Sequence, residues 1–209
     1  MESHLRVSSL SIGNCCHRFE VFKNTTVILS KPELQDIVAG NVVSRPNGLN
    51  PEIDIASIGL HLGSRFLRYI HPQKPHELPC EIPTEVVDVD DDGTIAFPPG
   101  ACILASTEEM VDMPLYLMGF IQSKGTIARG FVTVHLCDGQ IDPGYKGHIT
   151  LELVNLGPLD FRLRPGIAIA QLFFHRLTTP VEQGYSGRYQ NSREPTSMRA
   201  ELSKTNHLH

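Results

Sequence analysis

Gln140-Ile-Asp-Pro-Gly-Tyr-Lys-Gly-His-Ile-Thr-Leu-Glu-Leu-Val-Asn155 joins a tight turn to an alternating apolar run. Because proline holds φ at about −65° and glycine adopts positive φ readily, residues 142–145 are predicted to form a β-turn at the end of a strand. Such a turn presents an acid and an aromatic ring, which suits a small-molecule site. In the run 149–154, even-numbered residues would share one face of the next strand. Glu152 is therefore predicted to face a pocket or the solvent.

The same rhythm of short apolar runs extends through most of the chain. From about residue 53 onward, such runs alternate with Gly, Pro, Asn and Asp. Short strands separated by turn residues are typical of an all-β barrel or sandwich. The clearest predicted strands are 58–63, 130–136, 149–154 and 166–174.

One segment has the pattern of a short helix. In the segment 30–40, Ser30 can cap the N-terminus, Pro32 lies in the first turn and Gly40 can end the helix. Leucine, isoleucine and valine at positions 34, 37 and 38 would share its apolar face. No second helix is predicted with comparable signals.

The two ends of the chain differ in composition from the middle. Residues 1–26 show no sustained period and are treated as an N-terminal extension, residues 27–183 as the β domain, and residues 184–209 as a C-terminal tail. The tail is rich in Gly, Ser, Asn and Arg, so it has little apolar surface to bury and is expected to order only with a ligand.

Composition excludes several classes of partner. The chain has 209 residues, 41% of them hydrophobic, and a net charge of −5 without any basic block, so neither nucleic acid nor an anionic membrane is an expected partner. No basic segment with an apolar core opens the sequence, and no run approaches the roughly 20 apolar residues of a spanning helix. The five cysteines form no C-x-x-C pair, which favours free thiols in a reducing compartment. We expect a soluble, cytoplasmic protein.

Common enzyme and metal motifs are missing from the sequence. It contains no G-x-x-x-x-G-K-[ST], G-x-S-x-G or G-x-G-x-x-G. The acidic run 86–93 lacks the spacing and closing glutamate of an EF-hand loop, so a solvated hairpin tip is favoured over a calcium site. His76-Glu-Leu-Pro-Cys80 has the wrong spacing for a zinc deaminase and no second cysteine. No protein-held metal site is predicted.

Two polar segments have the side chains that bind phosphates. Gln122-Ser-Lys-Gly-Thr-Ile-Ala-Arg129 places a lysine, a hydroxyl and an arginine around a glycine. Backbone N–H groups at a glycine turn, an ammonium and a guanidinium together match a phosphate chain, although an ordinary polar loop has the same composition. Tyr185-Ser-Gly-Arg-Tyr-Gln190 adds two rings and an arginine, as a lid over a nucleotide would need.

The order of these segments resembles the dCTP deaminase branch of the dUTPase superfamily. The similarity extends from about residue 31 to residue 196. Ile-Asp-Pro-Gly-aromatic-x-Gly followed by Leu-Glu-x-x-Asn is its most specific element, and Tyr-x-Gly-Arg-Tyr-Gln favours deaminases over plain dUTPases. The segments that carry it are 55–63, 99–100, 123–129, 140–147, 151–155, 164–172 and 185–190.

The resemblance implies a distorted jelly-roll β-barrel that forms a homotrimer, with nucleotide sites shared between subunits and closed by the tail. It implies that Glu152 is the general base that activates water for attack on C4 of cytosine, and that Arg129 helps to fix the base and the water. Zinc is not implied, and magnesium is implied only as the counter-ion of the triphosphate. The implied substrate-binding residues are Lys124, Gly125 and Thr126 beside the phosphates, Asp142 and Tyr145 at the deoxyribose, the motif residue Gln171, and Tyr185, Arg188 and Tyr189 in the covering tail.

Three positions depart from the family pattern. Gly59 stands where the family usually has aspartate in its Ser-Val-Asp-Leu-x-Leu-Gly motif, so a polar contact of the usual site is expected to be lost. Gly125 replaces a catalytic-site serine, and Ser192 occupies a tail position that is commonly glutamine. Loss of one hydrogen bond that acts only in the transition state costs on the order of 100-fold in rate.

The resemblance and its departures support three hypotheses of function. The first is hydrolytic deamination of dCTP, or of a related deoxycytidine nucleotide, to dUTP and ammonia. The second is hydrolysis of dUTP to dUMP, alone or coupled to deamination, with Asp142 positioning water for attack on phosphate. The third, motivated by Gly59 and Gly125, is a catalytically weakened nucleotide-binding regulator. A separate, purely structural interpretation makes Glu152 a solvated strand residue.

Overall fold

The computed structural model describes residues 27–71 and 75–199, and most of the regular secondary structure in this part of the chain is β-strand. In chain order the elements are β1 (Val27–Ile28), α1 (Lys31–Ala39), β2 (Val43–Ser44), a 3-10 turn (Pro46–Gly48), β3 (Glu52–Ile53), β4 (Ile58–Tyr69), β5 (Thr84–Val86), β6 (Ile95–Phe97), β7 (Cys102–Asp112), β8 (Leu117–Ser123), α2 (Gly125–Ala128), β9 (Val132–Thr133), β10 (Gln140–Ile141), β11 (Lys146–Asn155), β12 (Phe161–Leu163) and β13 (Ala168–Arg176).

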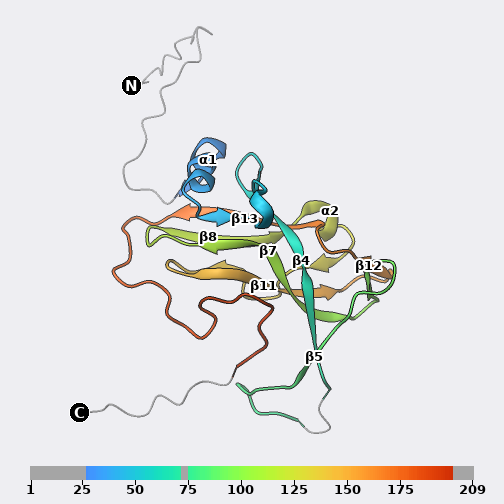
Figure 1. Cartoon of the computed structure of the whole chain (residues 1–209). Helices are drawn as coiled ribbons and strands as arrows, with labels where there is room; N and C mark the ends of the chain where they lie inside the picture. Colours follow the sequence, from blue (N-terminus) through green and yellow to red (C-terminus); the bar gives the residue numbers. More distant parts are fainter. Residues whose placement is uncertain (1–26, 72–74, 200–209) are drawn as a thin grey trace, which may run out of the picture.

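One curled antiparallel sheet forms the body of the molecule. Its strand order is β10-β8-β13-β4-β7-β11-β9. The long strand β4 belongs to both halves, because its first residues pair with β13 and its later residues with β7. In Figure 1 the β8–β13 half lies above the β7–β11 half, with β4 crossing between them. The predicted all-β, jelly-roll-like barrel is confirmed.

The hydrophobic core lies between the two halves of the sheet. Alternating residues of the strands point into it, and the largest fully buried side chains include Leu60, Phe66, Leu153 and Phe174. Burial of each such side chain stabilises the fold by roughly 1.5–3 kcal/mol. The period-2 pattern of the sequence therefore corresponds to the inner face of the barrel.

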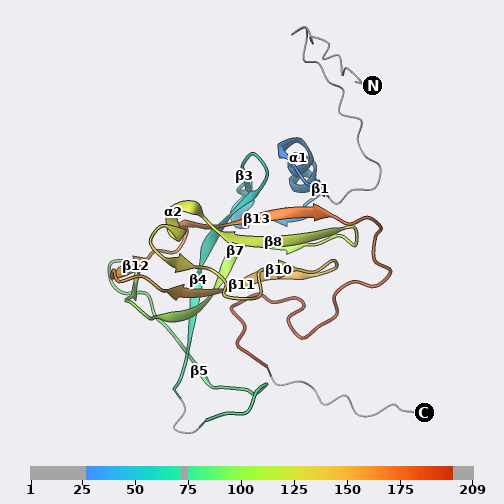
Figure 2. The same ribbon diagram turned by 180° about the vertical axis from the view of Figure 1, so that it is seen from behind.

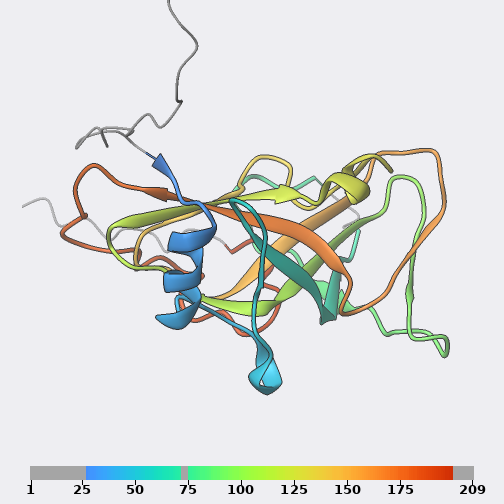
Figure 3. The same cartoon turned by 90° about the horizontal axis from the view of Figure 1, so that it is seen from above.

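Helix α1 forms where the sequence predicts it. The Glu33 carboxylate accepts hydrogen bonds from the backbone N–H and the hydroxyl of Ser30, and Gly40 ends the helix. Leu34 and Ile37 are buried against the core. Figures 2 and 3 show α1 on the β13 side of the molecule, together with the loop between β3 and β4. No helix in the described ranges is long and apolar enough to cross a membrane.

The predicted strand 130–136 is wrong except for Val132 and Thr133. Phe131 adopts a positive φ of 59°, which reverses the chain after α2. Beyond β9 the backbone departs from the regular ladder, although the Glu152 N–H still donates to the Val134 carbonyl at 2.8 Å. Tertiary contacts with β11 determine this conformation.

The structure describes residues 184–199 of the tail, and they lie against the barrel. The expectation that the tail orders only with a ligand stays a prediction. The tail runs alongside β11, where the Asn191 N–H donates to Lys146 O at 2.7 Å and the His148 N–H donates to Ser192 O at 2.8 Å. These hydrogen bonds to an exposed strand edge compensate for the low apolar content of the tail. Residues 200–209 and the extension 1–26 lie outside the described residues.

The acidic run 86–93 forms a turn rather than a hairpin tip. Its flanking strands do not pair with each other, because β5 pairs with β4 and β6 pairs with β12. Asp90 and Asp92 both form ion pairs with Arg162 of β12. Hydrogen bonds from Thr94 are the main reason that the pKa of Asp92 lies below its ordinary value. These two aspartates therefore have partners from the protein itself.

Candidate active site

The turn at residues 142–145 has the predicted conformation. The Tyr145 N–H donates to Asp142 O at 3.1 Å, and Gly144 has φ of 82°. The turn is anchored to the end of β7 by a reciprocal pair of hydrogen bonds with Met113, each of 2.8 Å. Asp142 is half-buried and is held at the rim of a cavity.

Glu152 faces the same cavity from the middle of β11. The strand alternates as predicted, with Ile149, Leu151 and Leu153 buried and Glu152 half-buried. The Leu136 N–H donates to Glu152 Oε2 at 3.3 Å, which orients the carboxylate. The structure thus places the predicted general base in a pocket rather than on an open surface.

The cavity has a volume of about 380 Å³ and lies between the barrel and the tail. A cavity of this size is in the range of small-molecule sites. It is lined by Leu104, Ile121, Asp138, Gln140, Ile141, Asp142, Tyr145, Ile149, Thr150 and Glu152 of the barrel, and by Tyr185, Tyr189, Ser192, Thr196 and Met198 of the tail.

The tail wall is fixed by contacts with the turn and with β11. The Tyr185 N–H donates to Pro143 O at 2.7 Å, and its ring meets that of Tyr145 edge to face with a centroid distance of 5.8 Å. Gln190 bonds to the backbone of Gly144 and Lys146. The predicted tail residues Tyr185 and Tyr189 are therefore brought to Glu152.

Tyr145 is a buried wall of the cavity rather than an acid or a base. Its hydroxyl donates to His148 O at 2.6 Å, and burial raises the pKa of Tyr145 to about 12. The ring therefore stays neutral at physiological pH, which leaves it suited to stacking and shape recognition.

The predicted cationic residues lie outside this cavity. Three carboxylates line it, from Asp138, Asp142 and Glu152, whereas no lysine or arginine of the described residues does. Lys124, Gly125, Thr126 and Arg129 all belong to α2 or its ends. Arg129 Nη1 donates to Gly125 O at 3.1 Å, and the arginine is exposed. One chain therefore does not place these cations beside Glu152.

Two further predicted residues have other partners. Gln171 lies on β13, where its Nε2 donates to Asp54 Oδ2 and to Ser57 Oγ, each at 3.0 Å. Arg188 is exposed, and its guanidinium donates to the carbonyl of Arg199 within the tail. Neither residue lines the cavity.

Several cavity residues were missed by sequence reasoning. Asp138, Thr150 and Thr196 line the wall, and Ser192, noted only as a departure, bonds to Tyr189 O through its hydroxyl. Thr150 shares the predicted face of Glu152, so the alternation of β11 was a usable signal. Asp138 and Thr196 lie in segments without regular secondary structure, and such segments have no periodic pattern in the sequence that would reveal which side chains face the cavity.

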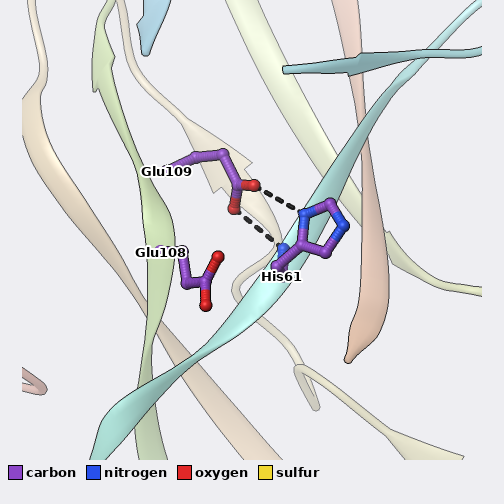
Figure 4. A group of neighbouring side chains, drawn as sticks. All are labelled: His61, Glu108 and Glu109. Atoms are coloured by element: carbon purple, nitrogen blue, oxygen red, sulfur yellow. Dashed lines mark hydrogen bonds and ion pairs between the residues drawn. The ribbon is translucent and has the colours of Figure 1, made fainter. Parts of the chain in front are cut away.

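One group of side chains in the described part of the chain is close enough to hold a metal ion: His61, Glu108 and Glu109. Figure 4 shows Glu109 directed at the His61 ring and backbone. Arg45 already forms ion pairs with both glutamates, at 2.7 Å and 3.2 Å. Because the guanidinium supplies the positive charge, this group is a protein ion-pair network.

Comparison with known proteins places this chain in a family. The model of the dCTP deaminase-like family matches residues 28–177. A dCTP deaminase of Halorubrum lacusprofundi is 34% identical over 188 residues, covering 83% of this chain and 91% of the relative. The dUMP-forming dCTP deaminases of Methanopyrus kandleri and Streptomyces coelicolor are 30% and 37% identical, covering 85% and 70% of this chain and 97% and 81% of those relatives.

A solved structure agrees at the level of the fold. The 2'-deoxycytidine 5'-triphosphate deaminase of Agrobacterium tumefaciens superimposes with a TM-score of 0.57 at 19% identity, covering 73% of this chain and 48% of that chain. With the matched family model and the extent of its sequence similarity to these relatives, the chain belongs to the dCTP deaminase-like family.

Proposed function

We propose that this chain catalyses the hydrolytic deamination of dCTP, or of a related deoxycytidine nucleotide. The observation that carries the proposal is the position of Glu152, which faces a cavity of about 380 Å³ next to the Asp142 turn. Together with membership of the dCTP deaminase-like family, this geometry favours a reaction at a nucleobase inside the cavity.

Glu152 acts as the general base in the proposed reaction. It takes a proton from water as the water oxygen bonds to C4 of cytosine, and the proton is then passed to the departing amine. The C4–N4 bond breaks and ammonia leaves, while the second proton of the water ends on N3, so C4 becomes a carbonyl carbon and no redox step is involved. General-base catalysis of this kind contributes roughly 10²–10⁴-fold in rate.

The proposed site is completed by a second subunit. The carboxylate-lined cavity repels a triphosphate, so cations must be supplied by a group outside its lining. We propose that, in a homotrimer, Lys124 and Thr126 of a neighbouring copy approach the phosphates and Arg129 of that copy approaches the base and the water beside Glu152. Phe131, Leu156 and Leu159 beside α2 are 58–67% exposed, which suits a surface that a second copy covers. Magnesium enters as the counter-ion of the triphosphate, and the proposed chemistry uses no zinc.

The final product depends on whether a phosphate bond is also hydrolysed. The relatives from Methanopyrus and Streptomyces are named as dUMP-forming enzymes. In this chain Asp142 lines the cavity of Glu152, where it can position water for attack on the phosphate chain. Coupled conversion of dCTP to dUMP is therefore the second candidate. Free thiols at Cys80, Cys102 and Cys137 fit the cytoplasmic location proposed with either activity.

A product assay tests the proposal directly. The purified protein is incubated with magnesium and either dCTP or dUTP, and products are resolved by ion-exchange chromatography. Formation of dUTP from dCTP supports deamination alone, and dUMP from dCTP supports the coupled reaction. If dUMP forms from dUTP alone, the protein is a dUTPase. If both nucleotides bind without turnover, it is a nucleotide-binding regulator.

Glu152→Gln tests the role of the base. The amide keeps an oxygen for the Leu136 N–H but cannot take a proton at neutral pH, so deamination should fall by about 10²-fold or more while dCTP affinity stays similar. Glu182→Gln, at an exposed glutamate of the chain, is the matched control. Retained turnover in Glu152→Gln would remove Glu152 from the mechanism.

A further inference from the structure

The space above Gly59 is filled by a carboxylate from the neighbouring strand. Glu52 of β3 pairs directly with Gly59 of β4. A Cβ atom added to Gly59 would lie 3.1 Å from Glu52 Oε2 and 3.3 Å from Glu52 Cβ. The Glu52 side chain therefore occupies the space in which the side chain of an aspartate at position 59 would lie.

A chain of polar contacts holds Glu52 in this position. Its Oε2 lies 3.5 Å from His61 Nε2. The other ring nitrogen of His61, Nδ1, lies 2.7 Å from Glu109 Oε1, and the backbone N–H of His61 donates to Glu109 Oε2 at 2.8 Å. Glu109 is fully buried, whereas the Glu52 side chain is 51% exposed. The network thus extends from the interior to a carboxylate at the surface.

Gln171, the motif glutamine, lies on the strand next to Gly59, and the same strand contacts the start of α2. Gln171 pairs with Gly59 on one side and with Gln122 on the other, and its amide is bonded to the turn between β3 and β4. The Lys124 N–H donates to Ile169 O at 2.9 Å, so the start of α2 is tied to β13 as well. Figure 2 shows β3 and α2 on the same side of the sheet.

We propose that Glu52 supplies from β3 the carboxylate that the family motif places on β4 at position 59, and that it is a positioning residue for the nucleotide site. The longer side chain of glutamate spans the separation between directly paired strands, about 4.5–5.5 Å between Cβ atoms. Glu52 contacts β4 at Gly59 and His61, and β3 leads directly into the β3–β4 turn. That turn accepts the hydrogen bonds of Gln171, which pairs with Gln122 at the start of the proposed phosphate-binding segment 122–129. The inference rests on the proposed function and deepens it, because it assigns the departure at Gly59 to relocation rather than loss.

The test is an exchange of the carboxylate between the two strands. Glu52→Ala should weaken dCTP affinity by about tenfold, because it removes the contact with His61 that holds β3 against β4 beside Gln171, with kcat changed less than about twofold. Gly59→Asp alone should weaken binding at least as much, because it crowds a second carboxylate against Glu52. The double variant should return to within about threefold of the wild-type affinity, since the two substitutions are coupled through direct contact.

The control is Glu85→Ala, which removes a glutamate of similar exposure, 46%, from an ion pair on β5. Melting temperatures of all variants show whether each is folded. Normal affinity in folded Glu52→Ala overturns the proposal, and so does a double variant that is no better than Glu52→Ala. A wild-type protein that binds dCTP without turnover contradicts the proposed enzyme activity, while the affinity comparison still tests Glu52.

Discussion

Gly144→Ala should detach the tail from the Asp142 turn. Gly144 has φ of 82°, and an added Cβ would lie 2.6 Å from Gly184 Cα and 2.9 Å from Tyr185 N. Because these are backbone atoms, no side-chain rotation relieves the overlap, and the tail must move. Gly100→Ala is a matched control: its glycine follows Pro99 in a second turn, has φ of 78°, and has no atom within 4 Å of the added Cβ.

Both substitutions place a residue with a Cβ in a left-handed conformation, but only Gly144→Ala also disrupts contacts with the tail. A left-handed conformation costs a residue with a Cβ roughly 1–2 kcal/mol, and both variants incur this cost. Only Gly144→Ala also breaks the two hydrogen bonds from Tyr185 and Gln190 to the turn and the contact between Tyr145 and Tyr185. At about 0.5–1.5 kcal/mol for each of these three contacts, tail docking should weaken by about 1.5–4.5 kcal/mol.

Hydrogen exchange of the tail amides measures this difference. Protection of the Tyr185 and Asn191 amides should fall in Gly144→Ala by about tenfold or more, as 1.5 kcal/mol corresponds to roughly that factor, and should persist in Gly100→Ala. Nucleotide affinity should fall in parallel, since the tail forms one wall of the cavity. Equal protection in the two variants would refute the reasoning that direct backbone contact at Gly144 holds the tail.

Two further predictions concern stability. Asn155→Ala should lower the melting temperature by about 6–12 °C. The fully buried amide of Asn155 donates to two carbonyls at 2.9 Å and accepts from an N–H at 3.0 Å, and these three hydrogen bonds together contribute about 3 kcal/mol. A decrease no larger than that of the exposed control Gln183→Ala would contradict this prediction. Ser30→Ala should lower the melting temperature at pH 7 by about 2–4 °C. Hydrogen bonds from Ser30 lower the pKa of Glu33. The stability contributed by these bonds is therefore present above the ordinary glutamate pKa and is lost as the pH falls through the lowered pKa. If the difference in melting temperature between Ser30→Ala and the wild type does not shrink below pH 4.5, the assignment is contradicted.

Local chemistry explains which parts of the fold were predictable. The helix at 31–39 and the turn at 142–145 depend on dihedral preferences and capping groups of consecutive residues, and both form as predicted. The alternation of 149–154 likewise places Glu152 on the correct face. The strand predicted at 130–136 failed because Phe131 adopts a positive φ, which its own preferences do not favour.

In the candidate site, too, local sequence determines some features and tertiary contacts determine others. The sequence by itself determined the family resemblance, which rests on short motifs in a fixed order, and the face on which the candidate base Glu152 lies beside its turn. Each motif is a property of neighbouring residues in one segment. Only the tertiary structure decided that the tail packs along β11, that the α2 cations lie outside the cavity, and that Glu52 covers Gly59. These relations depend on strand register and on contacts between distant segments, whose energies are set by the packed fold and leave no periodic signal in the sequence.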